Sequence, residues 1–375
     1  MKRNNDNRRL LSLDVLRGIT VAGMILVNNG YGETFHPLQH SKWNGMTPCD
    51  LVFPFFLFIM GVSTYLSLRK FQFRPSAGVI AKILRRTLLI FLIGLGINWF
   101  DLAVGGDWLP FSTIRIFAVL QRIALCYCVV SIFALMVPLS SRPAKRRGAS
   151  RRADAIIITT IVALLAVYSL ILLLGNGYAC DPSNILARVD RSIFGEAHLY
   201  HKSPVDPEGL LGTIPSIAHT LIGFYCGKLM TETLNLSQKI RNYLVVGIIL
   251  ILCGYLLQFA LPLNKRIWSP SYVLMTCGLA ATLQAILMYL IDLLGWKRWT
   301  VPFQVFGINP LFLYVLSELM AIFFGHFGIS DLIYQGVHAL IAAPKWASLA
   351  YALTFVLLCF LAGWPLYRRR IYIKI

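Results

Sequence analysis

Charged residues are scarce in this sequence, and acidic residues are the scarcest. Only 14% of the 375 residues are charged, and 35 Lys and Arg stand against 16 Asp and Glu, which gives a net charge of +19. Soluble domains average about 25% charged residues. Hydrophobic residues make up 57% of the chain, and the mean hydropathy is +0.67. A soluble globular protein is therefore excluded.

Several motifs are also absent. The sequence contains no CxxC or HExxH pattern, and Pro37 between His36 and His40 disfavours a metal pair on one helix face, so no metal site is expected. Six of the eight cysteines lie in apolar runs, where Cys acts as a small hydrophobe. We find no internal repeat, which disfavours an inverted-repeat transporter. No cleavable signal peptide is recognised, so the first apolar run is expected to be a retained span.

Long apolar runs recur along the whole chain. Runs of about 18 or more apolar residues are typical of membrane-spanning helices. The fold class we predict is an all-α membrane protein, a polytopic bundle of about ten transmembrane helices. The expected spans are residues 13–29, 48–68, 80–98, 111–138, 155–175, 211–230, 243–262, 268–292, 301–323 and 347–367.

The basic residues are distributed unevenly between these spans. If the N-terminus is cytoplasmic, 25 of the 35 Lys and Arg fall in cytoplasmic segments, seven fall on the opposite side and three lie within spans. This asymmetry follows the positive-inside rule. We therefore expect both termini in the cytoplasm, a bilayer rather than a nucleic acid as partner, and a single transmembrane acyltransferase domain over residues 1–375. That domain includes a basic cytoplasmic linker, 140–153, and a long outward loop, 175–210.

The polar, Gly-rich segment 28–50 is the strongest candidate for a functional site. It lies between two spans and faces outward in the predicted topology. His40 within it can accept a proton from an amine or a hydroxyl near neutral pH, although a loop histidine can also simply bond to backbone. Asn28 can cap the end of the first helix or donate a hydrogen bond to a developing oxyanion.

Other polar residues lie inside or beside apolar runs. Asp14 and Arg17 share a helix face, as an ion pair or as a contact for an anionic ligand. Arg115 and Arg122 are seven residues apart and fall on about one face of a span, where charges mark pathways or buried pairs. Asn309 is expected to face the bundle interior.

Two outward segments carry further candidates. The first contains Asp206 and Glu208, and the second contains Asn264, Lys265 and Trp268. An acidic pair and a basic-aromatic pair on the same side as His40 can hold a polar ligand. A Trp beside a Lys is also ordinary anchoring at the membrane interface.

Several segments together resemble the heparan-α-glucosaminide N-acetyltransferase family. They are LDVLRG (13–18), VNNG (27–30), HSKWNGMTPCDLVFPFFLFIMG (40–61), IRIFAVLQRIAL (114–125), DPEGLLGTIPSI (206–217), NKRIWSPSYVL (264–274) and FGINPLFLYV (306–315). They occur in the family's order and span nearly the whole chain. Lysosomal members carry an extra lumenal region before this core, so the chain resembles a short, bacterial-type member.

The resemblance implies a transmembrane acetyltransferase that moves an acetyl group from cytoplasmic acetyl-CoA to an amino sugar outside. It places the catalytic histidine on His40 and its partner asparagine on Asn28, with Asn29 as the neighbouring choice. Residues in the matching blocks are assigned to acetyl-CoA or to the acceptor sugar. The acetyl-CoA set is Arg17, Arg115, Gln121 and Arg122, and the acceptor set is Trp43, Asn44, Asp50, Asp206, Glu208, Asn264, Lys265, Trp268 and Asn309.

Two other functions remain open from the sequence. One is an amino-sugar transporter, and the other is an O-acetyltransferase acting on an exported polysaccharide, which would use the same histidine. The expected location is a bacterial inner membrane, and the sequence leaves a homodimer open.

Overall fold

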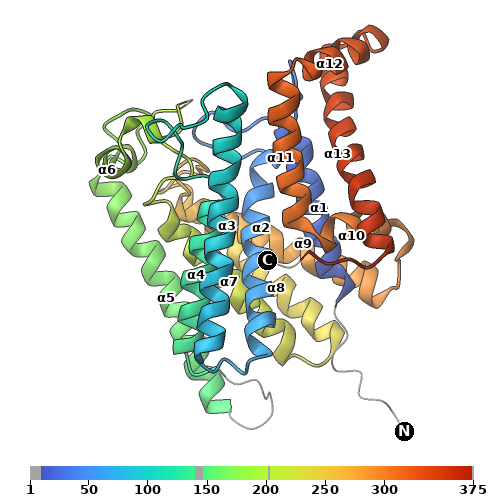
Figure 1. Ribbon diagram of the computed structural model, residues 1–375. Coiled ribbons are helices and arrows are strands. Elements are labelled where there is room, and N and C mark those ends of the chain that lie inside the picture. Colours follow the sequence, from blue (N-terminus) through green and yellow to red (C-terminus); the bar gives the residue numbers. More distant parts are fainter. Residues whose placement is uncertain (1–9, 140–146, 202, 374–375) are drawn as a thin grey trace.

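The computed structural model describes residues 10–139, 147–201 and 203–373. The predicted all-α polytopic bundle is confirmed, and helices α1 to α13 make up the molecule (Figure 1). Their bounds are α1 Leu11–Asn28, α2 Val52–Arg69, α3 Ala77–Val104, α4 Val119–Met136, α5 Arg147–Leu174, α6 Ile185–Phe194, α7 Thr213–Glu232, α8 Leu236–Leu257, α9 Pro270–Leu287, α10 Val301–Ile308, α11 Pro310–His326, α12 Ile329–Leu340 and α13 Pro344–Arg368.

Within the described residues, eight helices are long and apolar enough to cross a membrane, against about ten predicted spans. The predicted span 301–323 is broken, because its two halves, α10 and α11, meet at an angle of 75° at Asn309. Counted as one span, this pair would be the ninth. The predicted span 211–230 forms α7, which is too polar to be counted. Most of α7 is buried among other helices, so it does not need a lipid-facing surface.

The helices divide into an interior set and a peripheral set. Interior helices such as α2 and α7 bury most of their residues. The peripheral helix α3 exposes a stripe formed by Leu84, Leu88 and Leu92. These leucines are spaced four residues apart and share one face. Lipid contact explains such a face, because apolar side chains cost nothing there.

Glycine allows α2 and α7 to cross at close range. A Cβ built on Gly61 would lie 2.1 Å from the carbonyl oxygen of Thr220, and one built on Gly223 would lie 2.2 Å from the carbonyl oxygen of Phe58. Each helix therefore presents a glycine to the backbone of the other. Small residues at such crossings let helices approach closely in membranes.

Helix α1 runs from one end of the bundle to the other. Its 18 residues span about 27 Å. The first turn, with Asp14, lies near α10 and the end of α13, because Gly307 packs against the Asp14 carbonyl. The last turn, with Asn28, leads into the loop that carries His40. We call these the Asp14 end and the His40 end.

The connecting segments differ in part from expectation. Residues 140–146 of the predicted basic linker lie outside the described residues, and from Arg147 the chain is already helical in α5. The long loop 175–210 contains α6 and a short 3-10 helix, Glu196–His198. The amphipathic helix α12 lies across the ends of α11 and α13 at the top of Figure 1.

We expect Gly61→Ala to destabilise the protein by about 1–3 kcal/mol, because the added methyl group overlaps backbone atoms of α7. Gly96→Ala on α3 is the matched control, since its Cβ meets no atom within 4 Å. The control should melt at or above the wild-type temperature. Thermal unfolding of the purified proteins in detergent measures both. Equal melting temperatures for Gly61→Ala and the wild type would contradict the close crossing.

Candidate active site

His40 is hydrogen-bonded to a buried carboxylate. Its Nδ1 lies 2.7 Å from Oδ1 of Asp50, the imidazole side chain is 50% exposed, and the Asp50 side chain is fully buried. A buried carboxylate that accepts the Nδ1 proton leaves Nε2 as the free base of the ring. One face of the imidazole is thus fixed by the protein while the other is open to a substrate.

The sequence Thr-Pro-Cys-Asp at 47–50 positions this carboxylate. Thr47 is the N-cap of a short 3-10 helix, Pro48–Leu51, and forms a capping box with Asp50. Oδ2 of Asp50 accepts hydrogen bonds from the backbone amides of Thr47 at 3.0 Å and Ser41 at 3.1 Å. Tyr272 donates to the carbonyl oxygen of Asp50 at 2.5 Å. Oδ1 therefore remains available to His40.

Lys265 completes the group of charges. Its Nζ lies 3.4 Å from Oδ1 of Asp50 and 3.0 Å from Nδ1 of His40. Cys49 also contacts His40, with its Sγ 3.1 Å from Nδ1. The site is thus an imidazole held between a carboxylate and an ammonium group.

Hydrogen bonds between two distant loops bring Lys265 to His40. The Gly45 amide donates to the Leu263 carbonyl at 2.7 Å, and the Asn264 amide donates to Oδ1 of Asn44 at 3.2 Å. Trp43 donates through Nε1 to the Tyr178 carbonyl at 2.8 Å. The structure therefore places Trp43, Asn44 and Asn264, which we assigned to the acceptor sugar, in contacts that hold the loops together.

Trp268 is buried beneath these loops. Its backbone φ is +53°, its ring packs edge-on against Phe53 and Tyr272, and the guanidinium of Arg122 lies 5.3 Å from its ring centroid. Arg122 is itself fully buried and donates to the Gly209 carbonyl at 2.9 Å. Trp268 and Arg122 thus form a buried pair behind the loops at the His40 end.

Arg115 pairs with both predicted outer carboxylates. Its guanidinium donates to Asp206 at 2.6 Å and to Glu208 at 2.8 Å, and it lies over the ring of Tyr200. Burial raises the pKa of Asp206 despite the attraction of Arg115. Burial would also raise the pKa of Glu208, but Arg115 and Arg122 outweigh it and lower that pKa.

Lys265 also contributes to the charges around Glu208, because its positive charge lowers the pKa of that carboxyl group.

Gln121 is buried one residue before Arg122 and packs against Gly94. Arg115, Gln121 and Arg122, which we assigned to acetyl-CoA, therefore lie at the His40 end and not at the predicted cytoplasmic end.

Asn28 and Asn29 have different partners. Asn28 donates to Oε1 of Glu318 on α11 at 3.0 Å, and within the described residues no hydrogen bond joins it to His40. Asn29 is the residue that caps α1, and its amide donates to the Ile25 carbonyl at 2.7 Å. Capping thus falls on Asn29, and Asn28 is held by a carboxyl group.

Two of the sequence candidates lie at the Asp14 end. Arg17 donates to Asp14 at 3.0 Å and to Ser63 at 2.9 Å. Asn309 binds the chain after α13, since its amide donates to the Ile371 carbonyl and its oxygen accepts from the Ile373 amide, both at 2.9 Å. Asn309 was assigned to the acceptor sugar, but the structure does not bring it near His40.

Sequence reasoning missed three residues whose side chains contact His40 or Asp50. Thr47 was detectable, because Thr-x-x-Asp before an apolar run is a capping signature. Cys49 was not singled out as a site residue. Tyr272 lies inside an apolar run and gave no signal, because nothing in its local pattern shows that α9 passes behind Asp50.

These features define a polytopic membrane protein with a histidine–carboxylate pair at one end of its helix bundle. The family model described as "Heparan-alpha-glucosaminide N-acetyltransferase, catalytic" matches residues 9–254. The chain therefore belongs to this family, which confirms the resemblance seen in the sequence.

Curated relatives agree with this assignment. The chain is 29% identical to heparan-alpha-glucosaminide N-acetyltransferase of Homo sapiens, over 98% of this chain and 60% of that protein. It is also 29% identical to the enzyme of the same name from Mus musculus, over 94% of this chain and 60% of that protein. The chain thus spans about 60% of the length of the curated relatives it matches.

We expect Arg115→Met to destabilise the protein by about 3–5 kcal/mol, because Asp206 and Glu208 would remain buried without their counter-charge. Arg191→Met in the same loop is the control, since within the described residues Arg191 donates to the carbonyls of Pro182 and Pro204 and to no carboxylate. It should cost less than about 1 kcal/mol. Denaturation in detergent compares the two, and equal losses would refute a structural role for the Arg115 network.

Proposed function

We propose that the protein transfers an acetyl group from cytoplasmic acetyl-CoA to the amine of a glucosamine-type sugar on the outer side of the membrane. The observation that carries this proposal is the half-exposed His40 imidazole bonded to the fully buried Asp50 carboxylate. The family and the names of the two relatives support an N-acetyltransferase. The donor, the direction of transfer and the acceptor are our inference.

His40 acts as the general base in this mechanism. Asp50 holds the ring through Nδ1, so Nε2 takes a proton as the amine attacks the thioester carbonyl. The new C–N bond forms, the tetrahedral intermediate collapses, and the C–S bond breaks. The CoA thiolate leaves and takes up the proton from His40. In an alternative route His40 itself carries the acetyl group before the amine attacks.

The developing oxyanion needs a donor near His40. Asn28 is our candidate, because its amide nitrogen keeps a second N–H beyond the one given to Glu318. Lys265 is a second candidate, since its ammonium group lies beside the imidazole. Loss of one such donor typically raises the barrier by roughly 2.7–4 kcal/mol.

The direction of transfer follows from charge. Most Lys and Arg flank the spans on the side of the Asp14 end in the predicted topology, and this distribution favours that end as cytoplasmic. His40 then meets the acceptor outside, while the charged nucleotide of acetyl-CoA stays inside. Only the thin pantetheine arm has to enter the bundle.

We expect His40→Ala and Asp50→Asn to lower the rate of acetyl transfer by about 10²–10⁴-fold, because each removes or disorients the base. His36→Ala is the control, since this exposed histidine lies in the same loop. The assay uses purified protein in vesicles with radiolabelled acetyl-CoA and glucosamine, and mass analysis distinguishes N-acetyl from O-acetyl products.

Thermal melting of each variant confirms that the fold is intact. Native turnover by His40→Ala would refute the assignment of the base. If glucosamine crossed the vesicle membrane unmodified while no acetyl group moved, the protein would be a transporter instead.

A further inference from the structure

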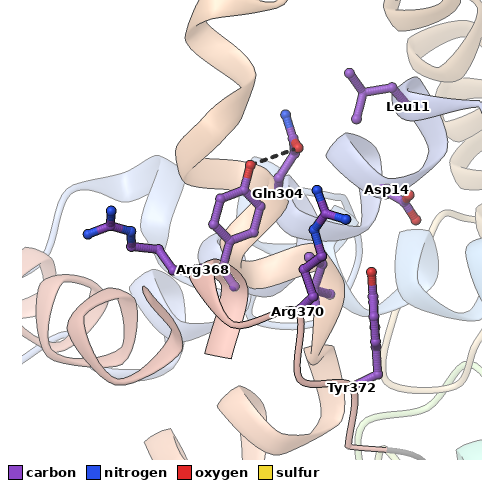
Figure 2. A pocket seen from close by; sticks show the side chains of 8 residues that line it. Leu11, Asp14, Gln304, Arg368, Arg370 and Tyr372 are labelled. Atoms are coloured by element: carbon purple, nitrogen blue, oxygen red, sulfur yellow. Dashed lines mark hydrogen bonds between the residues drawn. The ribbon is translucent and has the colours of Figure 1, made fainter. Parts of the chain in front are cut away.

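The two ends of the bundle are covered by different kinds of segment. At the Asp14 end, the chain after α13 is held by hydrogen bonds from Asn309 and borders a cavity of about 480 Å³, with Arg370 and Tyr372 in its wall (Figure 2). At the His40 end, a complete helix, α12, lies across the ends of α11 and α13 (Figure 1). The surroundings of α12 therefore bear on how the His40 end is held.

The length of α13 places α12 at the level where a bilayer meets water. Helix α13 has 25 residues, which span about 37 Å along its axis. The hydrocarbon core of a bilayer is about 30 Å thick, so the two ends of α13 reach the two polar interfaces. Trp346 lies in the first turn of α13 and is 58% exposed, and exposed tryptophan is typical of this level. Helix α12 ends at Leu340, shortly before α13 begins.

Helix α12 turns one face to the bundle and leaves an apolar face exposed. Ile333 and Tyr334 pack against the buried cluster that includes Tyr351. Leu332 and Leu340 lie on the next face around the helix, and they are 72% and 88% exposed. Exposed apolar faces of this kind mark contacts with a membrane or with another protein. An amphipathic helix that lies across the ends of membrane-spanning helices is suited to the membrane interface.

Lipid is the cover that fits this face, because exposed apolar side chains continue from it along α13. Helix α13 carries a stripe of leucines that are each at least half exposed, Leu353, Leu357 and Leu361. Trp346 shares the face of this stripe by helical spacing. The apolar segment 341–344, which is exposed throughout, leads from Leu340 to Trp346. The apolar face of α12 is thus joined to a surface of the kind that membrane-spanning helices present to lipid.

Another side of α12 holds the loop that leads to His40. The hydroxyl of Tyr31 donates a hydrogen bond to Asp331, and the ring of Tyr31 lies 5.1 Å from the ring of Tyr334. Gly32 follows with a φ of +69°, and a Cβ built on it would lie 2.9 Å from the Tyr334 hydroxyl. The loop therefore passes directly against the helix.

The start of α13 holds the same loop. The Tyr31 amide donates to Oγ of Ser348 at 3.2 Å. The ring of Phe35 packs edge-on against the ring of Trp346, with 5.0 Å between the centroids. Residues 31–35 are thus fixed to α12 and α13, and the chain reaches His40 five residues later.

We propose that α12 lies flat in the membrane–water interface at the His40 end, with Leu332 and Leu340 in contact with lipid, and that it anchors the loop leading to His40 at that level. Interfacial helices bury their apolar face about 5–10 Å into the boundary between headgroups and acyl chains. Gln335, which is exposed on the polar side of α12, stays in water. The anchor goes beyond the proposed function, because it holds the loop whichever reaction His40 performs.

Tryptophan quenching in nanodiscs measures the lipid contact. We expect the emission added by Leu340→Trp, after subtraction of the wild-type signal, to be lost in phosphatidylcholine that is brominated near the top of its acyl chains. Gln335→Trp is the matched control on the polar side of the same helix, and iodide in the water should quench it instead. Thermal melting confirms that both variants keep the wild-type fold.

Three results would overturn the interfacial position. If iodide but not brominated lipid quenches Leu340→Trp, α12 stands clear of the membrane. If neither agent quenches it, another protein surface, such as a second copy of this chain, covers the apolar face. If brominated lipid quenches Leu340→Trp and Gln335→Trp equally, the whole helix is submerged.

Hydrogen exchange in nanodiscs measures the anchoring. Leu340→Glu places a charge on the lipid-facing side, so we expect the backbone amides of residues 31–36 to exchange about tenfold faster than in the wild type as the helix loosens. Gln335→Glu is the matched control and should leave these amides unchanged, because its charge faces water. If Leu340→Glu also leaves them unchanged, lipid contact does not hold the loop and the anchor is refuted.

Discussion

The carboxylate of Asp50 imposes the main constraint on this molecule. A buried negative charge is costly unless it is paired and hydrogen-bonded. Here the demand is met by backbone amides at one oxygen and by His40 and Lys265 at the other. His40, Ser41 and Thr47 belong to the loop after α1, and Lys265 belongs to the loop before α9, so satisfying this one charge joins two loops that are distant in the sequence.

Polarity at the two ends of the bundle is organised in different ways. At the His40 end, buried carboxylates are paired with basic groups from other segments, as Asp206 and Glu208 are with Arg115. At the Asp14 end, Arg370 borders an open cavity beside Tyr372. The first arrangement fixes side chains in place, and the second leaves a basic side chain beside open space.

The sequence was sufficient for the fold class and for the location of the central histidine. Apolar runs predict membrane-spanning helices, and basic residues beside them predict the cytoplasmic side. Both features can be read from short stretches of the chain. The sequence was insufficient to predict which side chains contact one another, because a local pattern does not show which residues lie opposite in the helix bundle. Asn309 was predicted to face the bundle interior, and in the structure it donates a hydrogen bond to the chain after α13. Arg122 was assigned to acetyl-CoA through the family resemblance, but it is buried against Trp268 at the His40 end. Helix α7 was predicted as an ordinary span, because the sequence does not show whether an apolar helix faces lipid or other helices.

The docking of Gly45 and Asn44 onto Leu263 and Asn264 has a consequence for biogenesis. Helices enter the membrane in chain order during synthesis, so the loop bearing His40 is made long before its partner loop. Until α9 follows, Asp50 lacks the ammonium group of Lys265 and the hydroxyl of Tyr272. The group of charges around Asp50 is therefore completed late in translation, when Lys265 and α9 are made.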